Sequence, residues 1–299
     1  MITQSIDGVC FNMKTEQDFS FLKKYGKAFC VFDKNDSGNI SFGVDGGGGQ
    51  LFIKIAGTAT ANSCTSPQNA VDTLRTAVTT YEELRCPQLI TLIDSFKHEN
   101  LFVAVFKWAQ GECLFDYWNF EKYKNSPDIL PPMKKFKMLP LEKKLRAIDS
   151  IFEFLTLTEA KGYVAVDFYD GSLMYDFEHD VLTICDIDFF RKAPSINDMG
   201  EDFWGTMRLK ALEEYIAGAV IDSRTNVFTL GALMFHLLGG YTKGEIKKMY
   251  ENSAFFPCGY DAWQAGEGLY RAALKAVQAE RTQRYNSVAS FYSAWKTEL

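Results

Sequence analysis

The stretch from Gly162 to Phe190 constrains the fold most, because it places acidic side chains directly behind short apolar runs. Six aspartates lie in it. Asp167 follows the run 163–166, and Asp186 follows the run 182–185. Apolar and β-branched residues in such runs are typical of buried strands. Asp-Gly-Ser and Glu-His-Asp between the two runs predict turns. The pattern therefore predicts a hairpin-rich unit that brings two carboxylates toward one end.

Two carboxylates arranged in this way can divide a chemical task. One can accept a proton from a reacting hydroxyl group, and the other can hold a divalent cation through hard oxygen ligands. Kinase-type phosphoryl transfer divides the roles in this manner. A β-hairpin with polar turns and no catalytic role is the alternative interpretation of the same residues.

The composition limits the class of protein. The 299 residues are 47% hydrophobic and 23% charged, which fits a globular chain of two lobes or two small domains. A net charge of −6 argues against nucleic acid as the main partner. Seven scattered cysteines without C-x-x-C spacing favour reduced thiols over disulfides or a zinc site. Because no apolar run approaches about 18 residues and the start has no basic-then-apolar pattern, we expect a soluble, cytoplasmic protein without a membrane partner.

The first third of the chain alternates apolar runs with turn signals, as expected for an antiparallel sheet. Five runs have the length and the β-branched or aromatic content of strands. A pattern of apolar residues at 3/4 spacing predicts a helix between the third run and the fourth. The predicted strands cover residues 28–32, 40–44, 50–55, 89–94 and 101–106, and the predicted helix covers 67–85. Residues 1–28 are mixed and polar, with a short helix expected over 18–25.

Four consecutive glycines at 46–49 join the second and third predicted strands. We interpret them as a hairpin turn, because no G-K-S/T follows and a P-loop is therefore excluded. Lys54 lies inside the third strand run, among apolar residues. Burying an ammonium group without a partner is costly, so this lysine needs a reason to be there. Contact with phosphate is one reason, and an edge strand from which the lysine reaches water is the alternative.

Helical patterns dominate after residue 107. An amphipathic helix over 141–158 leads into the aspartate stretch, and an apolar helix over 222–238 follows it. The segment 125–140 has four prolines and three lysines, and we expect an exposed loop whose lysines form a solvated face. These lysines are Lys134, Lys135 and Lys137. The shift in composition places a domain boundary after residue 107, which gives domains 1–107 and 108–299.

The aspartate stretch resembles two motifs of the protein kinase-like family, the catalytic loop H-x-D-L-x-x-x-N and the metal-binding motif D-F-G. The first motif here begins at Ala165 and contains Asp167, with Ser172 in the place of the asparagine. The second motif is Asp186-Ile187-Asp188. The aspartates match, whereas the histidine, arginine and asparagine do not. The resemblance implies that Asp167 orients the acceptor and takes its proton, and that Asp186, with Ser172 as a weaker ligand, holds Mg²⁺.

Three later segments resemble further motifs of the same family, in the family's order. Residues 205–213 are similar to G-T-x-R-x-x-A-P-E, with Leu212 in the place of proline. Residues 222–231 are similar to D-V-W-S-L-G, with Asn226 in the place of aspartate, and residues 281–287 are similar to R-P-S/T. The resemblance implies a bidentate ion pair between Arg284 and Glu213.

The resemblance also assigns nucleotide contacts in the first domain. Lys54 matches the lysine of V-A-I-K and would position the α- and β-phosphates. The pattern G-x-G-x-x-G-x-V falls on Asp33, Asn35, Gly38 and Ile40. Only the third glycine is present, although asparagine tolerates left-handed geometry. Asn35 and Gly38 would then cover the phosphates.

The connection between the domains would bind the nucleoside. The resemblance implies that adenine bonds to the backbone of Lys107 and Ala109, and that Glu112 meets the ribose. The family's helix also carries a glutamate that pairs with the strand lysine. Ala77 holds its expected position, and Asp72, about one turn earlier, is the nearest candidate. The ion pair is therefore either absent or made by Asp72.

The resemblance thus implies an α+β, two-lobed protein kinase-like fold, with a small five-stranded antiparallel N-lobe and a larger helical C-lobe. The implied activity is that of a divergent kinase, similar to bacterial serine/threonine protein kinases, which uses ATP and Mg²⁺ to phosphorylate a hydroxyl acceptor. Two alternatives stay open. A pseudokinase that acts as a binding scaffold would explain the single glycine and the missing helix glutamate. A small-molecule kinase would explain Tyr169, which occupies the position of a lysine in the protein kinases.

Overall fold

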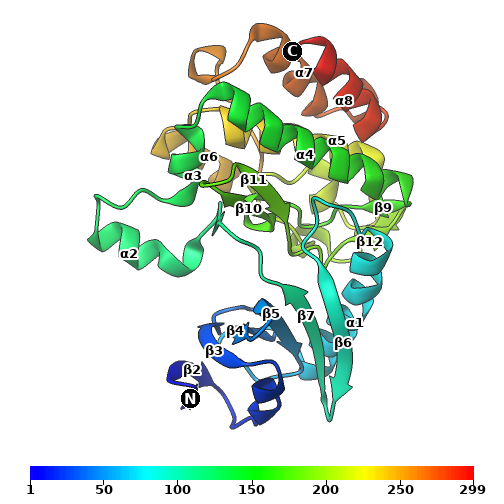
Figure 1. Cartoon of the computed structure of the whole chain (residues 1–299). Helices are drawn as coiled ribbons and strands as arrows, with labels where there is room; N and C mark the ends of the chain where they lie inside the picture. The colour runs from blue at the N-terminus through cyan, green and yellow to red at the C-terminus, as the bar shows by residue number, and fades with distance from the viewer. The chain divides into compact units, whose positions relative to one another are not determined.

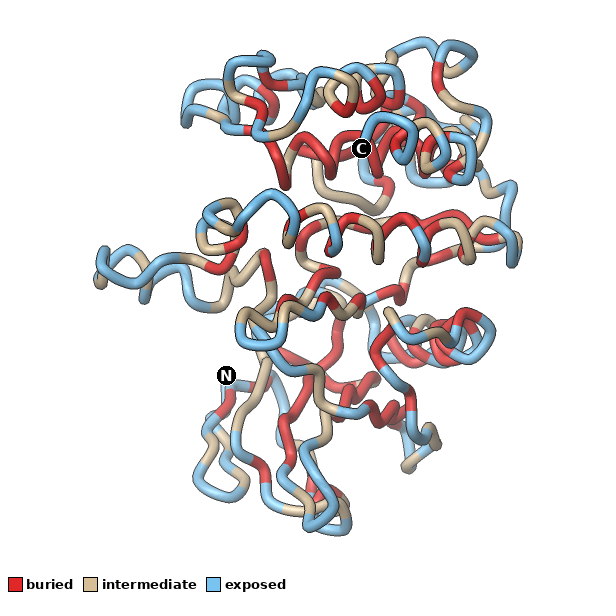
Figure 2. Tube along the Cα trace, turned by 45° about the horizontal axis from the view of Figure 1, so that its top comes forward, coloured by how far each residue is buried: buried red, intermediate tan, exposed pale blue.

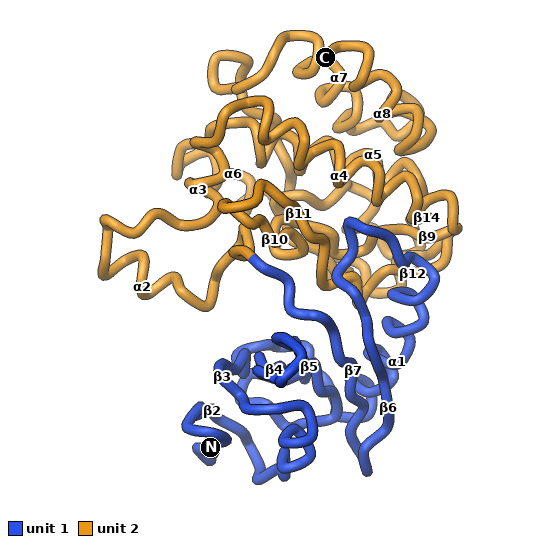
Figure 3. The backbone as a smooth tube through the Cα atoms, in the orientation of Figure 1, with its two compact units in different colours: residues 1–110 blue, residues 111–299 orange.

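The computed structural model describes all residues from 1 to 299, and the chain divides into two compact units. Unit 1 comprises residues 1–110 and unit 2 comprises residues 111–299 (Figure 3). Strands dominate unit 1 and helices dominate unit 2 (Figure 1). The α+β class predicted from the sequence is therefore confirmed. No helix is both long and apolar enough to cross a membrane.

Unit 1 is built on the predicted five-stranded antiparallel sheet, whose strand order is β3-β4-β5-β7-β6. The helix α1 lies in the chain between β5 and β6, as predicted. The glycine segment forms a hairpin turn in which Gly46 pairs with Gly49. The bounds are β3 Lys27–Phe32, β4 Asn39–Gly46, β5 Gly49–Ala56, α1 Pro67–Glu83, β6 Leu92–His98 and β7 Leu101–Lys107.

The N-terminal residues form a hairpin that the sequence analysis did not predict. Strand β1 (Ile2–Ile6) pairs with β2 (Val9–Met13), and only a short 3₁₀ helix follows at Ser20–Lys24. The turn is Asp7-Gly8, and both residues have positive φ angles. Asp-Gly between alternating residues is a strong hairpin signal, and it was overlooked because the segment is mostly polar.

Each face of the sheet is covered by a different element of unit 1. The N-terminal hairpin covers one face, where the ring of Phe11 lies 5.4 Å from that of Phe42 in an edge-to-face contact. Helix α1 contacts β5, β6 and β7. The ring of Tyr81 on α1 lies 4.9 Å from that of Phe106 on β7. The helix begins at a serine cap, Ser66, whose side chain accepts a hydrogen bond from Asn69 N.

Unit 2 is organised around helix α5 (Ser223–Leu238), of which thirteen of sixteen residues are buried; buried residues of the chain are drawn in red in Figure 2. The helix contacts four other helices of the unit. Such burial explains why the sequence of α5 is apolar all round rather than on one face. The other helices are α2 Phe120–Asn125, α3 Pro132–Lys137, α4 Leu141–Ala160, α6 Lys243–Asn252, α7 Glu267–Ala276 and α8 Val288–Thr297.

The strands of unit 2 are short and antiparallel. A three-stranded sheet has the order β11-β10-β8, and two further pairs join β12 to β9 and β13 to β14. Their bounds are β8 Glu112–Cys113, β9 Tyr163–Val164, β10 Leu173–Asp176, β11 Val181–Ile184, β12 Arg191–Lys192, β13 Ser195–Ile196 and β14 Val220–Ile221.

The segment 125–140 corrects the expectation of an exposed loop. It contains α3, in which Phe136 is fully buried. Lys134 is exposed, whereas Lys135 forms an ion pair with Glu112 and Lys137 is partly buried. The lysines therefore do not form one solvated face, because the short helix turns them toward different surroundings.

The contact between α5 and α7 leads to a stability prediction. A Cβ atom at Gly231 would lie 2.7 Å from Ala276 Cβ and 2.9 Å from Val277 Cγ1. We expect Gly231→Ala to cost about 1–3 kcal/mol of stability through overpacking, despite the better helix propensity of alanine. The control is Gly244→Ala on α6, where the nearest atom lies 3.9 Å from the new Cβ. Thermal melting distinguishes them, and a Gly231→Ala melting temperature equal to the wild type would contradict the close packing.

Candidate functional site

The β10–β11 hairpin brings two of the predicted site residues together. Ser172 directly precedes β10, and Asp186 lies two residues after the end of β11. Cys185 N donates a hydrogen bond of 2.9 Å to Ser172 O. The hairpin predicted from the aspartate stretch is present, and Ser172 and Asp186 lie at the same end of it.

Asp167 and Asp186 share an uncommon backbone conformation. Their φ angles are +59° and +53°, and only six non-glycine residues of the chain have a positive φ. This left-handed region is unfavourable for residues that carry a Cβ atom, and such strain is concentrated at functional sites. Both predicted carboxylates are therefore held in conformations that the surrounding structure has to enforce.

The pKa of the Tyr169 phenol is affected by both carboxylates. Burial raises the pKa of Tyr169 far above its usual value, and the charges of Asp186 and Asp167 raise this pKa further. Both carboxylates are thus near enough to act on one phenol. The ring of Tyr169 folds over Gly171, where a Cβ atom would lie 2.4 Å from the ring. The position that carries lysine in the protein kinases is here filled by a partly buried, neutral aromatic side chain.

The strand that leads into Asp167 is anchored by helix α5. Asn226 Oδ1 accepts a hydrogen bond of 2.8 Å from Ala165 N, and Asn226 Nδ2 donates one of 3.5 Å to Tyr163 O. All three residues are buried. The sequence analysis noted Asn226 only as a motif residue. In the structure this side chain fixes the backbone two residues before Asp167.

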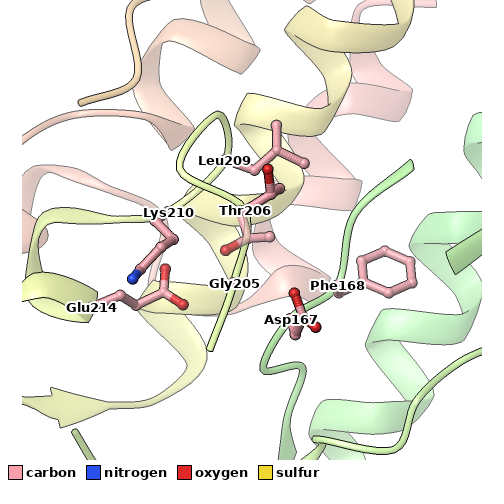
Figure 4. Close-up of a pocket in the computed structure, with 8 residues that line it drawn as sticks. Asp167, Phe168, Gly205, Thr206, Leu209, Lys210 and Glu214 are labelled. Carbon is pink, nitrogen blue, oxygen red and sulfur yellow. The ribbon is translucent and has the colours of Figure 1, made fainter. Parts of the chain in front are cut away.

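A small pocket joins Asp167 to the segment 205–214 (Figure 4). Its lining includes Thr206, Lys210 and Glu214. Lys210 is 4% exposed, and its Nζ donates hydrogen bonds to Phe203 O at 2.7 Å and to Glu201 O at 3.1 Å. The sequence analysis missed this lysine, because its burial depends on the fold of the whole segment. The pocket of Asp167 therefore contains a cation in spite of the substitution at Tyr169.

Glu214 is a neutral acid in the same pocket. Burial raises the pKa of Glu214 to about 8, although the hydrogen bond that its carboxylate accepts from Ala211 N lowers this pKa in part. The protonated form consequently predominates near neutral pH. The pocket thus combines one carboxylate near the surface, Asp167, with one buried carboxylic acid.

Glu213, the residue directly before Glu214, makes the predicted bidentate ion pair. Arg284 Nη1 donates to Glu213 Oε1 at 2.7 Å, and Arg284 Nη2 donates to Glu213 Oε2 at 3.1 Å. Thr225 on α5 adds a third hydrogen bond of 2.9 Å to Glu213 Oε1. Burial raises the pKa of Glu213, but the hydrogen bonds and charge of Arg284 outweigh it, so this pKa is lowered overall. The expected pairing is confirmed.

In unit 1, Lys54 lies in the central strand of the sheet and is 7% exposed. The alternative of an edge-strand lysine that reaches water is therefore wrong. Ser41 on β4 is the cross-strand partner of Lys54, and Asn39 lies two residues before it on the same face. Ser41 Oγ and Asn39 Oδ1 are buried without a hydrogen-bond partner. This face of the sheet thus carries a buried cation beside two unsatisfied oxygen atoms.

The turn between β3 and β4 contains the predicted phosphate-covering residues. The Asn35 carbonyl accepts a hydrogen bond from Thr60 Oγ1, and the Gly38 carbonyl accepts one from Thr58 Oγ1, each at 3.4 Å. Asp33 Oδ2 accepts a hydrogen bond of 2.9 Å from Asn12 N in the N-terminal hairpin. The turn is therefore tied to its own unit, and the role of Asn35 and Gly38 toward phosphate stays a prediction.

The residues predicted to bind the nucleoside differ in whether their hydrogen-bonding groups are already engaged within the chain. The amide of Lys107 donates to Thr91 O at 2.9 Å, whereas the backbone of Ala109 makes no hydrogen bond. In unit 2, Lys135 Nζ donates to both carboxylate oxygens of Glu112 at 2.7 and 2.9 Å. Ala109 is consequently the residue of this group with free backbone groups, and a ribose would have to compete with Lys135 for Glu112.

Helix α1 does not offer Asp72 as the acidic partner of a strand lysine. Asp72 pairs with Arg75 at 3.0 Å and accepts a hydrogen bond from Gln68 at the exposed surface of the helix. Ala77, at the position expected for the glutamate, is buried. The proposal that Asp72 reaches toward the lysine is therefore wrong, because the helix turns its side chain to solvent.

The acidic residues fit Mg²⁺ only as part of a larger complex. No group of three or more His, Cys, Asp or Glu side chains of the chain is arranged to hold a metal ion. Asp186 is exposed, and Ser172 Oγ is a buried oxygen without a hydrogen-bond partner. Mg²⁺ is commonly held by one or two carboxylates together with phosphate oxygens and water. The residues present fit a Mg²⁺ ion that arrives with a nucleotide.

The Glu213–Arg284 pair gives a prediction for a double-mutant cycle. We expect Glu213→Ala to cost about 3–5 kcal/mol, because it leaves the fully buried guanidinium of Arg284 without its carboxylate. The double variant Glu213→Ala/Arg284→Ala should cost clearly less than the sum of the two single changes. Denaturant unfolding measures all three variants, and strict additivity would contradict the pairing.

Glu214 gives a prediction for the pH dependence of stability. Its folded-state pKa of about 8 lies above the ordinary value of 4.5 for a glutamate, so the folded state holds the proton more tightly between these two pH values. Stability should therefore fall as the pH rises from about 5 to 8. Glu214→Gln should remove part of this fall, since an amide does not titrate. Melting temperatures across this range test it, with the exposed Glu178→Gln as the control, and parallel curves for wild type and Glu214→Gln would contradict it.

Comparisons with known proteins add no relative to this description. No protein-family model matches the chain, and no curated protein matches it. A functional interpretation therefore depends on the geometry of the two units and on the motif resemblance.

Proposed function

We propose that this chain is an ATP- and Mg²⁺-dependent phosphotransferase of the protein kinase-like type, which transfers the γ-phosphoryl group to a hydroxyl acceptor. The observation that carries the proposal is the backbone of Asp167. This residue adopts a left-handed conformation at the end of a strand that Asn226 anchors from the core. Asp186 adopts the same conformation beside Ser172. This arrangement supports a pair of carboxylates with separate roles.

In this proposal Asp167 acts on the acceptor. Its carboxylate orients the hydroxyl group and accepts the proton as the hydroxyl oxygen bonds to the γ-phosphorus and the bond to ADP breaks. Lys210 lines the same pocket and contributes positive charge beside the reacting groups. Lys54 contacts the phosphates of the nucleotide.

Asp186 and Ser172 are the residues that would hold Mg²⁺, together with phosphate oxygens and water. When bound, the ion neutralises negative charge on the phosphates. Ser172 offers a single neutral oxygen, so Asp186 provides most of the attraction from the chain. The exposure of Asp186 is consistent with a ligand that enters from solvent.

A nucleotide-independent scaffold is the second candidate. It is favoured by the turn between β3 and β4, whose carbonyls at Asn35 and Gly38 accept hydrogen bonds within unit 1. It is also favoured by Ala77 in the place of the helix glutamate. A scaffold of this kind would bind a protein partner and would neither need Mg²⁺ nor turn over ATP.

The two candidates differ in a thermal-shift titration with ATP. A ligand that binds the native state raises the melting temperature by mass action. We expect ATP with Mg²⁺ to raise it by several degrees in the wild type, and Lys54→Met and Asp186→Asn to abolish the Mg²⁺-dependent rise. Lys97→Met, which removes an exposed lysine on β6, is the matched control and should respond like the wild type. No rise at any ATP concentration would favour the scaffold.

Turnover separates binding from catalysis. Asp167→Asn should keep the Mg²⁺·ATP response and should lower the rate of ADP formation by about 10²–10⁴-fold, because the amide cannot accept the proton. Radiolabelled ATP measures transfer to the chain itself, to a test protein or to water. Equal rates for the wild type and Asp167→Asn would remove Asp167 from the catalytic role.

A further inference from the structure

Unit 2 contains a second pocket, with about 430 Å³ of empty space including its open mouth. The polar part of its lining consists of Lys137, Arg208 and His236. These residues come from α3, from the segment after Thr206 and from α5, so three separate parts of unit 2 bring nitrogen donors to one place. The proposed phosphotransferase mechanism uses none of them.

The lysines at this pocket have no carboxylate partner. Lys137 Nζ donates a hydrogen bond of 2.7 Å to Gly239 O. Behind it, Lys144 is 4% exposed, and its Nζ donates to Gln264 Oε1 at 2.7 Å and to Lys137 O at 3.2 Å. Neither lysine forms an ion pair. Burying an ammonium group without a counter-charge is costly, so an anion in the pocket would be favoured.

Asp170, the acid nearest the lining, already forms an ion pair with a cation other than Lys137, namely Arg208. Asp170 is 1% exposed, and Arg208 Nη2 donates to its Oδ1 at 2.7 Å. His236 Nε2 lies 2.8 Å from Asp170 Oδ2. Burial lowers the pKa of His236, in spite of the opposing charge of Asp170, so the imidazole is neutral and donates this hydrogen bond. The charge of Asp170 is therefore balanced by Arg208, and the charge of Lys137 remains in excess.

The remaining lining is mostly apolar. Ile246 and Met249 come from α6, and Phe255 follows that helix. Tyr241 completes the wall, but its hydroxyl group is engaged, since it donates to Phe256 O and accepts from Cys258 N, each at 3.1 Å. An inorganic ion would leave these apolar surfaces in contact with water. A ligand that extends along them would bury more apolar area.

We propose that this pocket binds a small molecule that joins a phosphate or carboxylate group to an apolar body, with the anionic group against Lys137 and the apolar body against Ile246, Met249 and Phe255. The inference does not depend on the proposed phosphotransferase activity. It requires only the excess cation and the apolar wall that share the pocket.

The proposal has two parts, the anionic group and the apolar body. They can be tested separately by comparing phenyl phosphate with inorganic phosphate and with phenol. Isothermal titration of the full chain without ATP or Mg²⁺ should give a dissociation constant for phenyl phosphate at least tenfold lower than for either fragment. Phenylacetate, compared with phenol, tests whether a carboxylate replaces the phosphate. Phenyl phosphate that binds no better than phosphate or phenol would overturn the proposal.

Matched variants locate the site. Lys137→Met should weaken phenyl phosphate at least tenfold, whereas Lys137→Arg should bind it to within about threefold of the wild type. Lys134→Met removes an exposed lysine of the same helix and should leave binding unchanged. Lys54→Met should also leave it unchanged, which distinguishes this pocket from the proposed nucleotide contacts. Equal binding by Lys137→Met and Lys134→Met would overturn the assignment.

A measurement on the wild type covers the case in which Lys137→Met does not fold. Burial lowers the pKa of Lys137 to about 8, so the neutral and reactive amine is well populated at mildly alkaline pH. Phenyl phosphate should slow acetylation of Lys137 by acetic anhydride at least threefold and leave that of Lys134 unchanged, as read by mass spectrometry of peptides. Equal rates of acetylation with and without phenyl phosphate would overturn the proposal.

Discussion

Helix α5 is buried along its length, so each polar side chain that it carries must find its hydrogen bonds inside unit 2. Thr225 bonds to Glu213, Asn226 bonds to the amide of Ala165, and His236 bonds to Asp170. Ala165 and Asp170 lie on either side of Asp167 in the connection between β9 and β10, and Glu213 lies in a later segment. One apolar helix therefore fixes the segment of the Glu213–Arg284 pair, the strand before Asp167 and the loop after it. Because the loops are held from the core, the backbone at Asp167 can be kept in an unfavourable conformation.

Buried acids and buried lysines of unit 2 have different kinds of hydrogen-bond partner. Its most deeply buried acid with a charge, Asp170, is paired with Arg208. The buried lysines instead bind carbonyl oxygens, as Lys210 does at Phe203 and Lys137 at Gly239. A carbonyl group satisfies the hydrogen bond but leaves the net charge in place. In the pocket lined by Lys137 this leaves excess positive charge, although the chain as a whole carries −6, whereas Lys210 shares its pocket with the carboxylate of Asp167. Local burial, and not net charge, makes the pocket of Lys137 suited to an anion.

The sequence predicts a strand correctly where the spacing of its apolar residues coincides with backbone pairing to a neighbouring strand. The prediction fails where apolar residues are buried without such pairing. The runs of β3, β4 and β5 were found because alternate residues face a core. The run 89–94 was taken as a strand, but Leu89 and Ile90 are buried ahead of β6, which begins at Leu92. Apolar residues there mark burial without strand pairing. The pair Glu213–Arg284 was predictable because both residues belong to sequence motifs. Lys210 was missed and Lys137 was wrongly expected on a solvated face, because only tertiary packing determines their burial.

Departures from the kinase-like pattern occur in both units, and those in unit 1 bear on the choice between enzyme and scaffold. The turn at 33–38 and the buried Ala77 count against nucleotide contacts in that unit. In unit 2 two aspartates keep left-handed backbones. A non-glycine residue in this region costs about 1–3 kcal/mol, and aspartate lies at the lower end because it tolerates the region better than most residues. A scaffold gains nothing from holding two carboxylates in this way, since relaxed turns would present the same surface. The strain is explained if both carboxylates must point at reacting groups, and it therefore favours the phosphotransferase.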